Sequence, residues 1–278
     1  MTALFVSAHL DDAALSCAAS LLRARARGER VIVATVFTEG KGSRARRQED
    51  RRALEAFGIE AIHLGALDAP ERLGVAPSFS SLLLEPRVDR ALVARIAARL
   101  HRLIAELRPR AVHLPLGIGG HIDHRTVFAC RRALRARAAP GFALRFYEDR
   151  PYAFVPALRA LRLLELRGGA GAPRLAERLG AQLARVPLLD SFASEEERAS
   201  CLRALEKRLS SARAPSLALR SAILRAAPAQ SAAVVSLIES YRSQQQPLFG
   251  DQGVQASLRR YACDAQGRIY ERWWSERR

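Results

Sequence analysis

The sequence predicts an α/β fold with a mostly parallel sheet and helices on both faces. In the first half of the chain, short apolar segments alternate regularly with helical patterns. Each helical pattern is long enough to carry the chain back across a sheet to the start of the next strand. This alternation is typical of parallel sheets that are covered by helices on both faces.

Five strands and four helices are expected up to residue 148. The expected strands are 3–9, 30–38, 61–65, 110–116 and 142–148, and the expected helices are 13–27, 44–58, 88–107 and 124–138. Apolar runs such as ALFVSAH and RVIVATVFT indicate buried strands, whereas RARRQEDRRALEAFG has helical spacing. Gly58 closes the second helix and Pro109 stops the third.

The rest of the chain is less regular. Residues 66–87 form a long, Pro-interrupted connection after the third strand, which suggests a lid or a substrate-binding loop. GGAGAP at 168–173 indicates a flexible break, residues 174–240 read as helices, and 248–278 should hold short strands around RRYACD and GRIYERWW. We therefore expect an α/β catalytic core over 1–167 and a helical and short-strand region over 168–278 that packs on it, within one catalytic domain.

The charge of the chain does not indicate nucleic-acid binding as its main function. The formal net charge is +17, yet among 45 Lys and Arg residues only Lys41 and Lys207 are lysines. The arginines are scattered among alanines and leucines, as in RRALRARAA, instead of forming one patch. We attribute them to a compositional bias and expect no nucleic-acid partner.

The cysteines and the hydropathy pattern indicate a protein of the cytoplasm. The four cysteines have no CxxC spacing and form no small disulfide framework, so reduced thiols are expected. The first residues lack a basic segment followed by an apolar core, and no run of about 18 apolar residues occurs in the sequence. Neither secretion nor a membrane span is therefore expected.

Two short polar motifs follow two of the expected strands. AHLDD comes after the first strand and GGHIDH after the fourth, so both should lie at the rim where ligands bind in open α/β sheets. His9 and Asp12 can point at a common centre, and His124 can supply a third ligand. Two histidines and one carboxylate with an open fourth position form a catalytic zinc (Zn²⁺) pattern, in which bound water has a pKa lowered to about 7.

Three further side chains of these motifs are candidates for catalytic roles other than metal binding. Asp11 is the candidate general base, a protonated His121 could stabilise an oxyanion or protonate the departing amine, and Asp123 could orient an imidazole. Read alone, HLDD is more often an aspartate that caps a helix than a metal site. The other histidines fall on strands or a helix face, where a structural role is expected: His63, His101 and His113.

The motif pair resembles the PIG-L/LmbE-like family of zinc-dependent deacetylases, whose motifs are usually AHPDDE and HxDH. RRQEDRRALEAFG resembles the Arg-xx-Glu helix of the family, and PLGIGGHIDH, YEDRPYA and IESYRSQ with YERWW are similar to one of its branches. The resemblance implies a Rossmann-like fold. It also implies hydrolysis of an N-acetyl group on an amino-sugar-containing small molecule or glycoconjugate.

The resemblance assigns roles by motif position. It implies zinc ligands at His9, Asp12 and His124, with Asp11 as base and His121 as the electrostatic or acid group. Arg46 and Asp68 match positions that approach sugar hydroxyls in relatives, although they could equally be a solvated helix residue and a turn residue. Removal of a larger acyl group, cleavage of a thiol conjugate, a nucleotide- or nucleic-acid-binding module and a non-catalytic family member stay as alternatives.

The chain departs from the family pattern at three positions. Leu10 replaces the usual proline of AHPDDE and Ala13 replaces its glutamate, so the first loop keeps its ligands but changes its surroundings. Gly119 stands two residues before His121, where mycothiol-type relatives carry a tyrosine. These changes leave metal binding in place and bear on substrate and rate.

Overall fold

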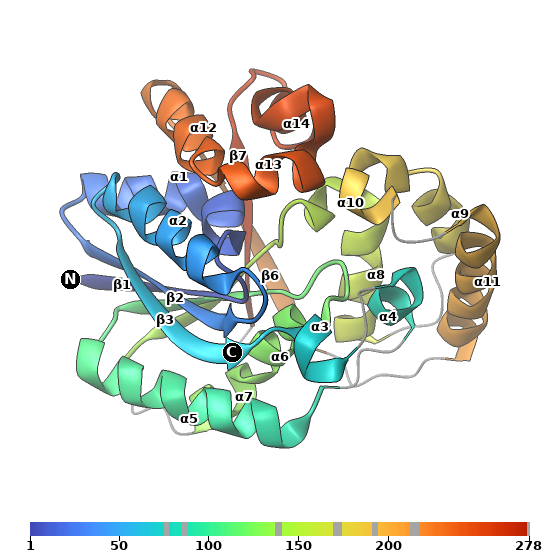
Figure 1. Ribbon diagram of the computed structural model, residues 1–278, viewed down its shortest axis with the longest axis horizontal. Helices are drawn as coiled ribbons and strands as arrows, with labels where there is room; N and C mark the ends of the chain where they lie inside the picture. The colour runs from blue at the N-terminus through green and yellow to red at the C-terminus, as the bar shows by residue number, and fades with distance from the viewer. Residues whose placement is uncertain are drawn as a thin grey trace.

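A single mixed sheet of seven strands organises the protein (Figure 1). The computed structural model describes residues 1–74, 78–84, 88–136, 141–168, 174–190, 194–211 and 217–276. The strand order is β3-β2-β1-β4-β5-β7-β6. The strands are β1 (Thr2–Ser7), β2 (Arg30–Glu39), β3 (Glu60–Leu67), β4 (Ala111–Pro115), β5 (Ala143–Tyr147), β6 (Leu219–Arg225) and β7 (Tyr270–Glu276).

The first five strands are parallel and the last two are antiparallel to their neighbours. β1 pairs with β2 on one side and with β4 on the other, and β4 pairs with β5. β7 then runs antiparallel between β5 and β6. The predicted α/β fold with a mostly parallel sheet is confirmed.

Helices cover both faces of this sheet (Figure 1). α1 (Asp12–Ala26) and α2 (Ser43–Glu55) lie on one face, and α5 (Arg90–Leu107), α6 (Ile122–Ala129) and α7 (Arg131–Ala136) lie on the other. The later helices are α8 (Pro156–Arg167), α9 (Leu175–Gly180), α10 (Pro187–Asp190), α11 (Glu195–Ser211), α12 (Ser231–Glu239), α13 (Arg242–Phe249) and α14 (Gly253–Tyr261). Because both faces are covered, β1 and β4 are buried almost throughout, which is why they read as continuous apolar runs.

The second half contains a strand where helices were expected. Residues 174–240 include β6, which lies at the edge of the sheet and is mostly exposed. Its sequence LRSAILR has no apolar run that distinguishes a strand from a helix, so only the pairing with β7 decides its conformation.

The expected short strands of the last segment are partly wrong. RRYACD begins within α14, and only Cys263 makes an isolated bridge, to Ile269, whereas GRIYERWW does form a strand, β7. The expected long connection contains two short helices, α3 (Ala69–Leu73) and α4 (Phe79–Leu83). The expected break at 168–173 lies outside the described residues except for Gly168.

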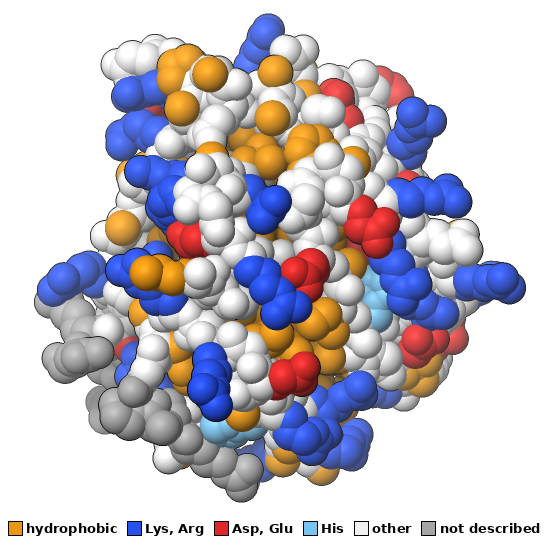
Figure 2. Space-filling model, turned by 90° about the vertical axis from the view of Figure 1, so that its left-hand side faces the viewer, with side chains coloured by type: hydrophobic (Ala, Val, Ile, Leu, Met, Phe, Trp, Pro, Cys, Tyr) orange, Lys and Arg blue, Asp and Glu red, His pale blue; other side chains and the backbone are white. Residues whose placement is uncertain are grey.

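The distribution of surface charge and the state of the cysteines can be compared with the expectations from the sequence. On the face seen in Figure 2, Lys and Arg side chains are spread among neutral and acidic ones and do not gather in one patch. The four cysteines are free, and Cys17, Cys130 and Cys201 are buried. Within the described residues, no helix has the length and apolar character needed to cross a membrane.

Candidate functional site

The two polar motifs meet at the carboxyl ends of β1 and β4. His9, Asp11 and Asp12 follow β1, and His121 and His124 lie at the start of α6, directly after the loop from β4. Because these strands are parallel neighbours, their loops reach the same edge of the sheet. The ring centre of His9 lies 4.8 Å from that of His121 and 5.2 Å from that of His124.

Asp12 lies between two imidazoles. Its Oδ2 atom is 3.3 Å from Nδ1 of His9 and 3.2 Å from Nε2 of His124. Tetrahedral nitrogen and oxygen ligands at about 2.0–2.1 Å from zinc stand about 3.3–3.4 Å from one another. The Asp12 oxygen therefore lies at the separation expected between two zinc ligands from one nitrogen of each histidine, and the donor types of the three residues fit the ion.

Carboxylates hold the opposite nitrogen of each imidazole. Nε2 of His9 is 3.2 Å from Oδ2 of Asp123, and Nδ1 of His124 is 2.6 Å from Oδ1 of Asp149. The other oxygen of Asp149 accepts hydrogen bonds of 2.8 Å from the backbone N–H groups of Gly117 and Ile118. A carboxylate behind a histidine, which fixes its orientation and tautomer, is the usual arrangement for a metal ligand.

The site is negatively charged and can stabilise a cation. Burial lowers the pKa of His9, but hydrogen bonds to Asp12, Asp123 and Asp68 outweigh it and raise that pKa well above its usual value. Burial likewise opposes ionisation of Asp12, yet His124 and His9 hold its pKa well below the usual range. The centre thus favours an ionised Asp12 and a positive charge beside it.

Asp11 differs from its neighbour in both contacts and acidity. Burial, followed by the charge of Asp12, raises the pKa of Asp11 to about 6. Its Oδ1 atom is 3.1 Å from Nη2 of Arg46. Although Asp11 precedes α1, its side chain makes no capping hydrogen bond, so the helix-cap alternative is not supported.

His121 lies beside the centre as a neutral imidazole. Burial, together with the charges of His9 and His124, lowers its pKa to about 3. Its Nδ1 atom accepts a hydrogen bond of 3.3 Å from the backbone N–H of Asp123, which leaves the proton on Nε2. Among the described residues, two groups of side chains have ligand atoms that all lie within 4.8 Å of one another: His9 with His121 and His124, and His9 with Asp68 and Asp123.

The loop after β3 closes one side of the site. Asp68 caps α3, and its Oδ1 atom accepts from the N–H of Ala69 at 2.7 Å and lies 3.3 Å from Nε2 of His9. Arg72 of the same helix donates to Oδ1 of Asp123 at 2.6 Å. Part of the segment expected to be a lid is therefore tied directly to the two motifs.

A pocket of about 160 Å³ opens onto these side chains. The predicted residues His9, Asp11, Asp12, Arg46, Asp68, His121 and His124 all line it, whereas Asp123 lies behind His9. Further lining residues come from later segments: Tyr152, Gln244 and Leu248.

The sequence reasoning missed Asp149 and Tyr152. Both lie in YEDRPYA, a segment that pointed only to the family and to no role. Asp149 is fully buried, and Tyr152 is 6% exposed with its ring against that of His124, 5.8 Å between centres. The hydroxyl of Tyr152 has no hydrogen-bond partner among the described residues, although its ring lines the pocket.

Tyr152 also explains the glycine two residues before His121. Gly119 has φ +87°, and a Cβ atom there would lie 2.3 Å from Cγ of Tyr152. The ring of Tyr152 therefore occupies the space that a side chain at position 119 would need. A glycine, in place of the tyrosine of mycothiol-type relatives, is what this packing requires.

Comparison with known proteins agrees with this geometry. Residues 4–134 match the family model PIG-L, described as GlcNAc-PI de-N-acetylase. Comparison with curated protein sequences gives no match.

Solved structures of similar fold include three deacetylases. The antimicrobial A40926 pseudoaglycone deacetylase Dbv21 is 22% identical with a TM-score of 0.66, over 99% of this chain and 97% of that chain. A deacetylase–teicoplanin complex is 20% identical with a TM-score of 0.63, over all of both chains. The zinc-inhibited form of teicoplanin deacetylase Orf2 is 19% identical with a TM-score of 0.61, over 100% of this chain and 99% of that chain.

At these identities the similarity to solved structures establishes the fold, and the family model establishes the relationship. The resemblance predicted from the sequence is confirmed, because the matched range contains both motifs. Over residues 4–134 the chain carries a PIG-L domain, that of the GlcNAc-PI de-N-acetylase family of hydrolases.

Proposed function

We propose that this protein is a zinc-dependent N-deacetylase that releases acetate from an N-acetylated amino sugar in a glycoconjugate. The observation that carries the proposal is the spacing of 3.2–3.3 Å between Asp12 Oδ2 and one nitrogen each of His9 and His124. The family and the deacetylase structures of the same fold support the reaction class.

Zinc would be held by His9, Asp12 and His124, and would supply Lewis-acid activation of water and of the amide carbonyl. Asp123 and Asp149 keep the two imidazoles in the orientation and tautomer that this requires. The zinc-inhibited neighbour agrees with a zinc-binding site in this fold.

Asp11 would act as the general base and then as the acid. Its pKa of about 6 leaves it ionised at neutral pH but able to take a proton from water as the water oxygen attacks the carbonyl carbon. When the carbon–nitrogen bond breaks, the same proton passes to the departing nitrogen. The products are a free amine and acetic acid, which gives up the second proton of the water to become acetate, and Asp11 returns to its ionised form.

Two donors would stabilise the negative charge that develops on the carbonyl oxygen. The Nε2–H group of neutral His121 and the hydroxyl of Tyr152 both belong to side chains that line the pocket. The low pKa of His121 argues against the protonated imidazole expected from the sequence, but a neutral imidazole still donates a hydrogen bond. Burial raises the pKa of Tyr152 well above its usual value, so its hydroxyl keeps its proton.

The pocket favours a small acyl group over a large one. Its volume of about 160 Å³ is well below the roughly 300–1,000 Å³ of pockets that enclose a drug-sized ligand. The acetamido group would enter, and the rest of a glycoconjugate would lie over the rim formed by Arg46, Asp68 and Gln244. Arg46 and Asp68 are therefore proposed to bind sugar hydroxyls.

The experiment is a panel of N-acetylated sugars and glycolipids, scored for released amine and for acetate by mass spectrometry. Wild-type protein should contain about one zinc per chain, and Asp11→Asn should keep the zinc while turnover falls by about 10²–10⁴-fold. Release of a larger acid would show that the protein removes a larger acyl group than acetyl. A zinc-replete preparation without bound metal, or an Asp11→Asn variant with full activity, would refute the mechanism.

A further inference from the structure

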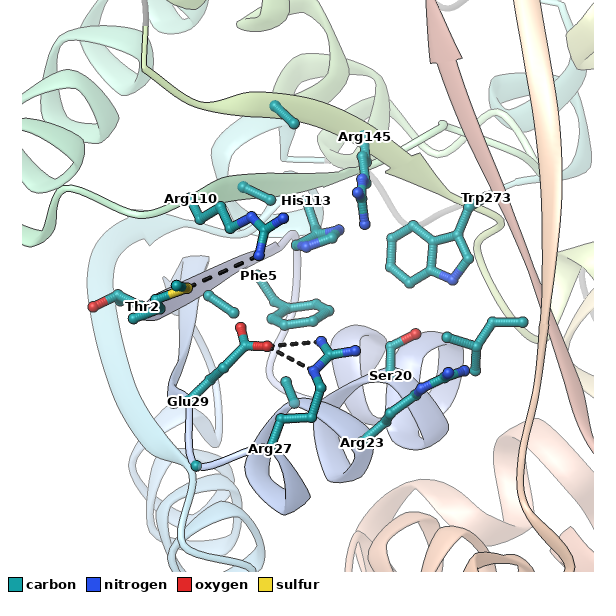
Figure 3. Close-up of a pocket in the computed structure, with 17 residues that line it drawn as sticks. Thr2, Phe5, Ser20, Arg23, Arg27, Glu29, Arg110, His113, Arg145 and Trp273 are labelled. Carbon is teal, nitrogen blue, oxygen red and sulfur yellow. Dashed lines mark hydrogen bonds and ion pairs between the residues drawn. The ribbon is translucent and has the colours of Figure 1, made fainter.

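A second and larger cavity lies at the opposite ends of the parallel strands. It has a volume of about 660 Å³ and opens beside the first residues of β1, β4 and β5, next to α1 (Figure 3). None of the residues that line it lines the pocket at the histidines and aspartates. Its volume lies within the roughly 300–1,000 Å³ that is usual for small-molecule sites.

The lining of this cavity is strongly basic. Four arginines line it, Arg23, Arg27, Arg110 and Arg145, against the single carboxylate of Glu29. Glu29 is already paired with Arg27 at 2.7 Å. In Figure 3 the guanidinium groups of Arg110 and Arg145 turn toward the middle of the cavity.

The other three arginines have no carboxylate partner among the described residues. The one polar contact of Arg110 there is with the sulfur of Met1, at 3.9 Å. Elsewhere some surface arginines pair with carboxylates, as Arg30 does with Glu60 at 2.7 Å, whereas others, such as Arg51 and Arg95, have no such partner among the described residues. What sets Arg23, Arg110 and Arg145 apart is that all three line one cavity.

The floor of the cavity contains a buried imidazole without a partner. His113 is 6% exposed, its Nδ1 atom is buried, and neither ring nitrogen has a hydrogen-bond partner among the described residues. The ring stacks on Phe5, with centres 4.3 Å apart, and meets the edge of Trp273 at 4.8 Å. Burial, followed by the charge of Arg145, lowers the pKa of His113 to about 3, so the ring is neutral.

The cavity continues along the antiparallel edge of the sheet. A second hollow of about 400 Å³ shares Arg23, Arg145, Leu224 and Trp273 with it. This hollow adds the 40%-exposed Ile223 of β6. It also adds a further arginine, Arg220, so the combined site is basic along its length and partly apolar near Ile223.

We propose that this cavity is a second ligand site, separate from the deacetylase pocket, and that it binds an organic diphosphate. A guanidinium group can bind two phosphate oxygens through two parallel hydrogen bonds. Three arginines without a carboxylate partner match a ligand with two or three negative charges. The ring system of the ligand would lie against His113 and Trp273 and the apolar edge near Leu224.

The test is calorimetric titration of the full chain with ADP, with inorganic pyrophosphate and with adenosine. We expect ADP to bind most tightly, pyrophosphate more weakly, and adenosine least. Arg110→Ala combined with Arg145→Ala should weaken ADP binding by about tenfold or more, because the two guanidinium groups that turn toward the middle of the cavity are removed. Arg145→Lys, which keeps the charge but loses the paired geometry, should give a smaller loss.

The matched control removes the same charge elsewhere. Arg51→Ala combined with Arg95→Ala changes two exposed arginines of α2 and α5 that do not line the cavity, and should leave ADP binding unchanged. Equal weakening by both pairs would overturn the proposal, as would absence of binding by ADP and pyrophosphate, or binding of duplex DNA alone with steep salt dependence. Asp11→Asn should bind ADP normally, so failure of the deacetylase proposal is detected separately.

Discussion

Replacement of Asp149 by asparagine should weaken zinc binding through the tautomer of His124. Asp149 accepts two backbone hydrogen bonds on Oδ2 and faces Nδ1 of His124 with Oδ1. The amide oxygen of asparagine can keep the backbone bonds, but its NH₂ group then faces Nδ1. Because two donors cannot share that contact, the imidazole proton must move to Nε2, the nitrogen beside Asp12.

The magnitude follows from the contacts that are lost. Two of three hydrogen bonds survive, so the free energy of unfolding should fall by about 1.5–3 kcal/mol, the net contribution of one charge-assisted bond. Loss of a partner behind a metal ligand costs about 10–100-fold in metal affinity. The fold should therefore persist while zinc binds about 10–100-fold more weakly.

The assay is a zinc competition titration against a chromogenic chelator, together with urea unfolding. Glu148→Gln is the matched control, because Glu148 is an adjacent buried carboxylate that accepts from Nε1 of Trp274 at 3.0 Å and makes no contact with the histidines. It should leave zinc affinity unchanged. A folded Asp149→Asn variant with wild-type zinc affinity would refute the reasoning.

Three further predictions concern the oxyanion donor, a glycine and a buried histidine. Tyr152→Phe should lower kcat by about 10²–10³-fold with little change in KM or zinc content, and unchanged kcat would remove the hydroxyl from the mechanism. Gly120→Ala places a Cβ 1.8 Å from the backbone oxygen of Leu82 and should destabilise the fold by about 2–4 kcal/mol in urea unfolding. Gly28→Ala, also at positive φ but with open space, should cost only about 1–2 kcal/mol, and equal costs would contradict the clash. The pKa of His113 is lowered to about 3 in the folded protein from an ordinary value near 6.5. The fold therefore has its full stability with respect to this group above about pH 6.5, where the ring is neutral in both the folded and the unfolded protein. This stability should be lost as pH falls from about 6.5 toward 3, at about 1.4 kcal/mol per pH unit, and unfolding of His113→Phe should lack this component.

The parallel part of the sheet was predictable because its strands are buried on both faces. β1 and β4 then need apolar side chains at nearly every position, and such a continuous apolar run can be recognised in the sequence alone. β6 carries no such signal, since it is an exposed edge strand whose conformation depends on β7, about fifty residues later. RRYACD was misread for a related reason: its aromatic and cysteine residues favour a strand, but its first residues continue the helix α14.

The candidate site was predictable where residue type and spacing coincide. His9, Asp12, His121 and His124 lie in two short motifs at equivalent strand ends, and the structure brings them together. Asp149 and Tyr152 could not be placed in this way, because an aspartate or a tyrosine after a strand has no local feature that reveals its partner. Only the packing of Tyr152 over Gly119 and the contact of Asp149 with His124 define their positions.

The position of β7 has a consequence for how the chain folds. β7 lies between β5 and β6, and among the described residues β6 has no other neighbour in the sheet. During synthesis β6 therefore leaves the ribosome before its pairing strand and stays unpaired until residues 270–276 have been synthesised. The five parallel strands need no such delay, so they can assemble first and offer the edge of β5, with which β7 and then β6 pair. Destabilisation of β7 should thus show itself as aggregation of nascent chains before it shows itself as lost activity.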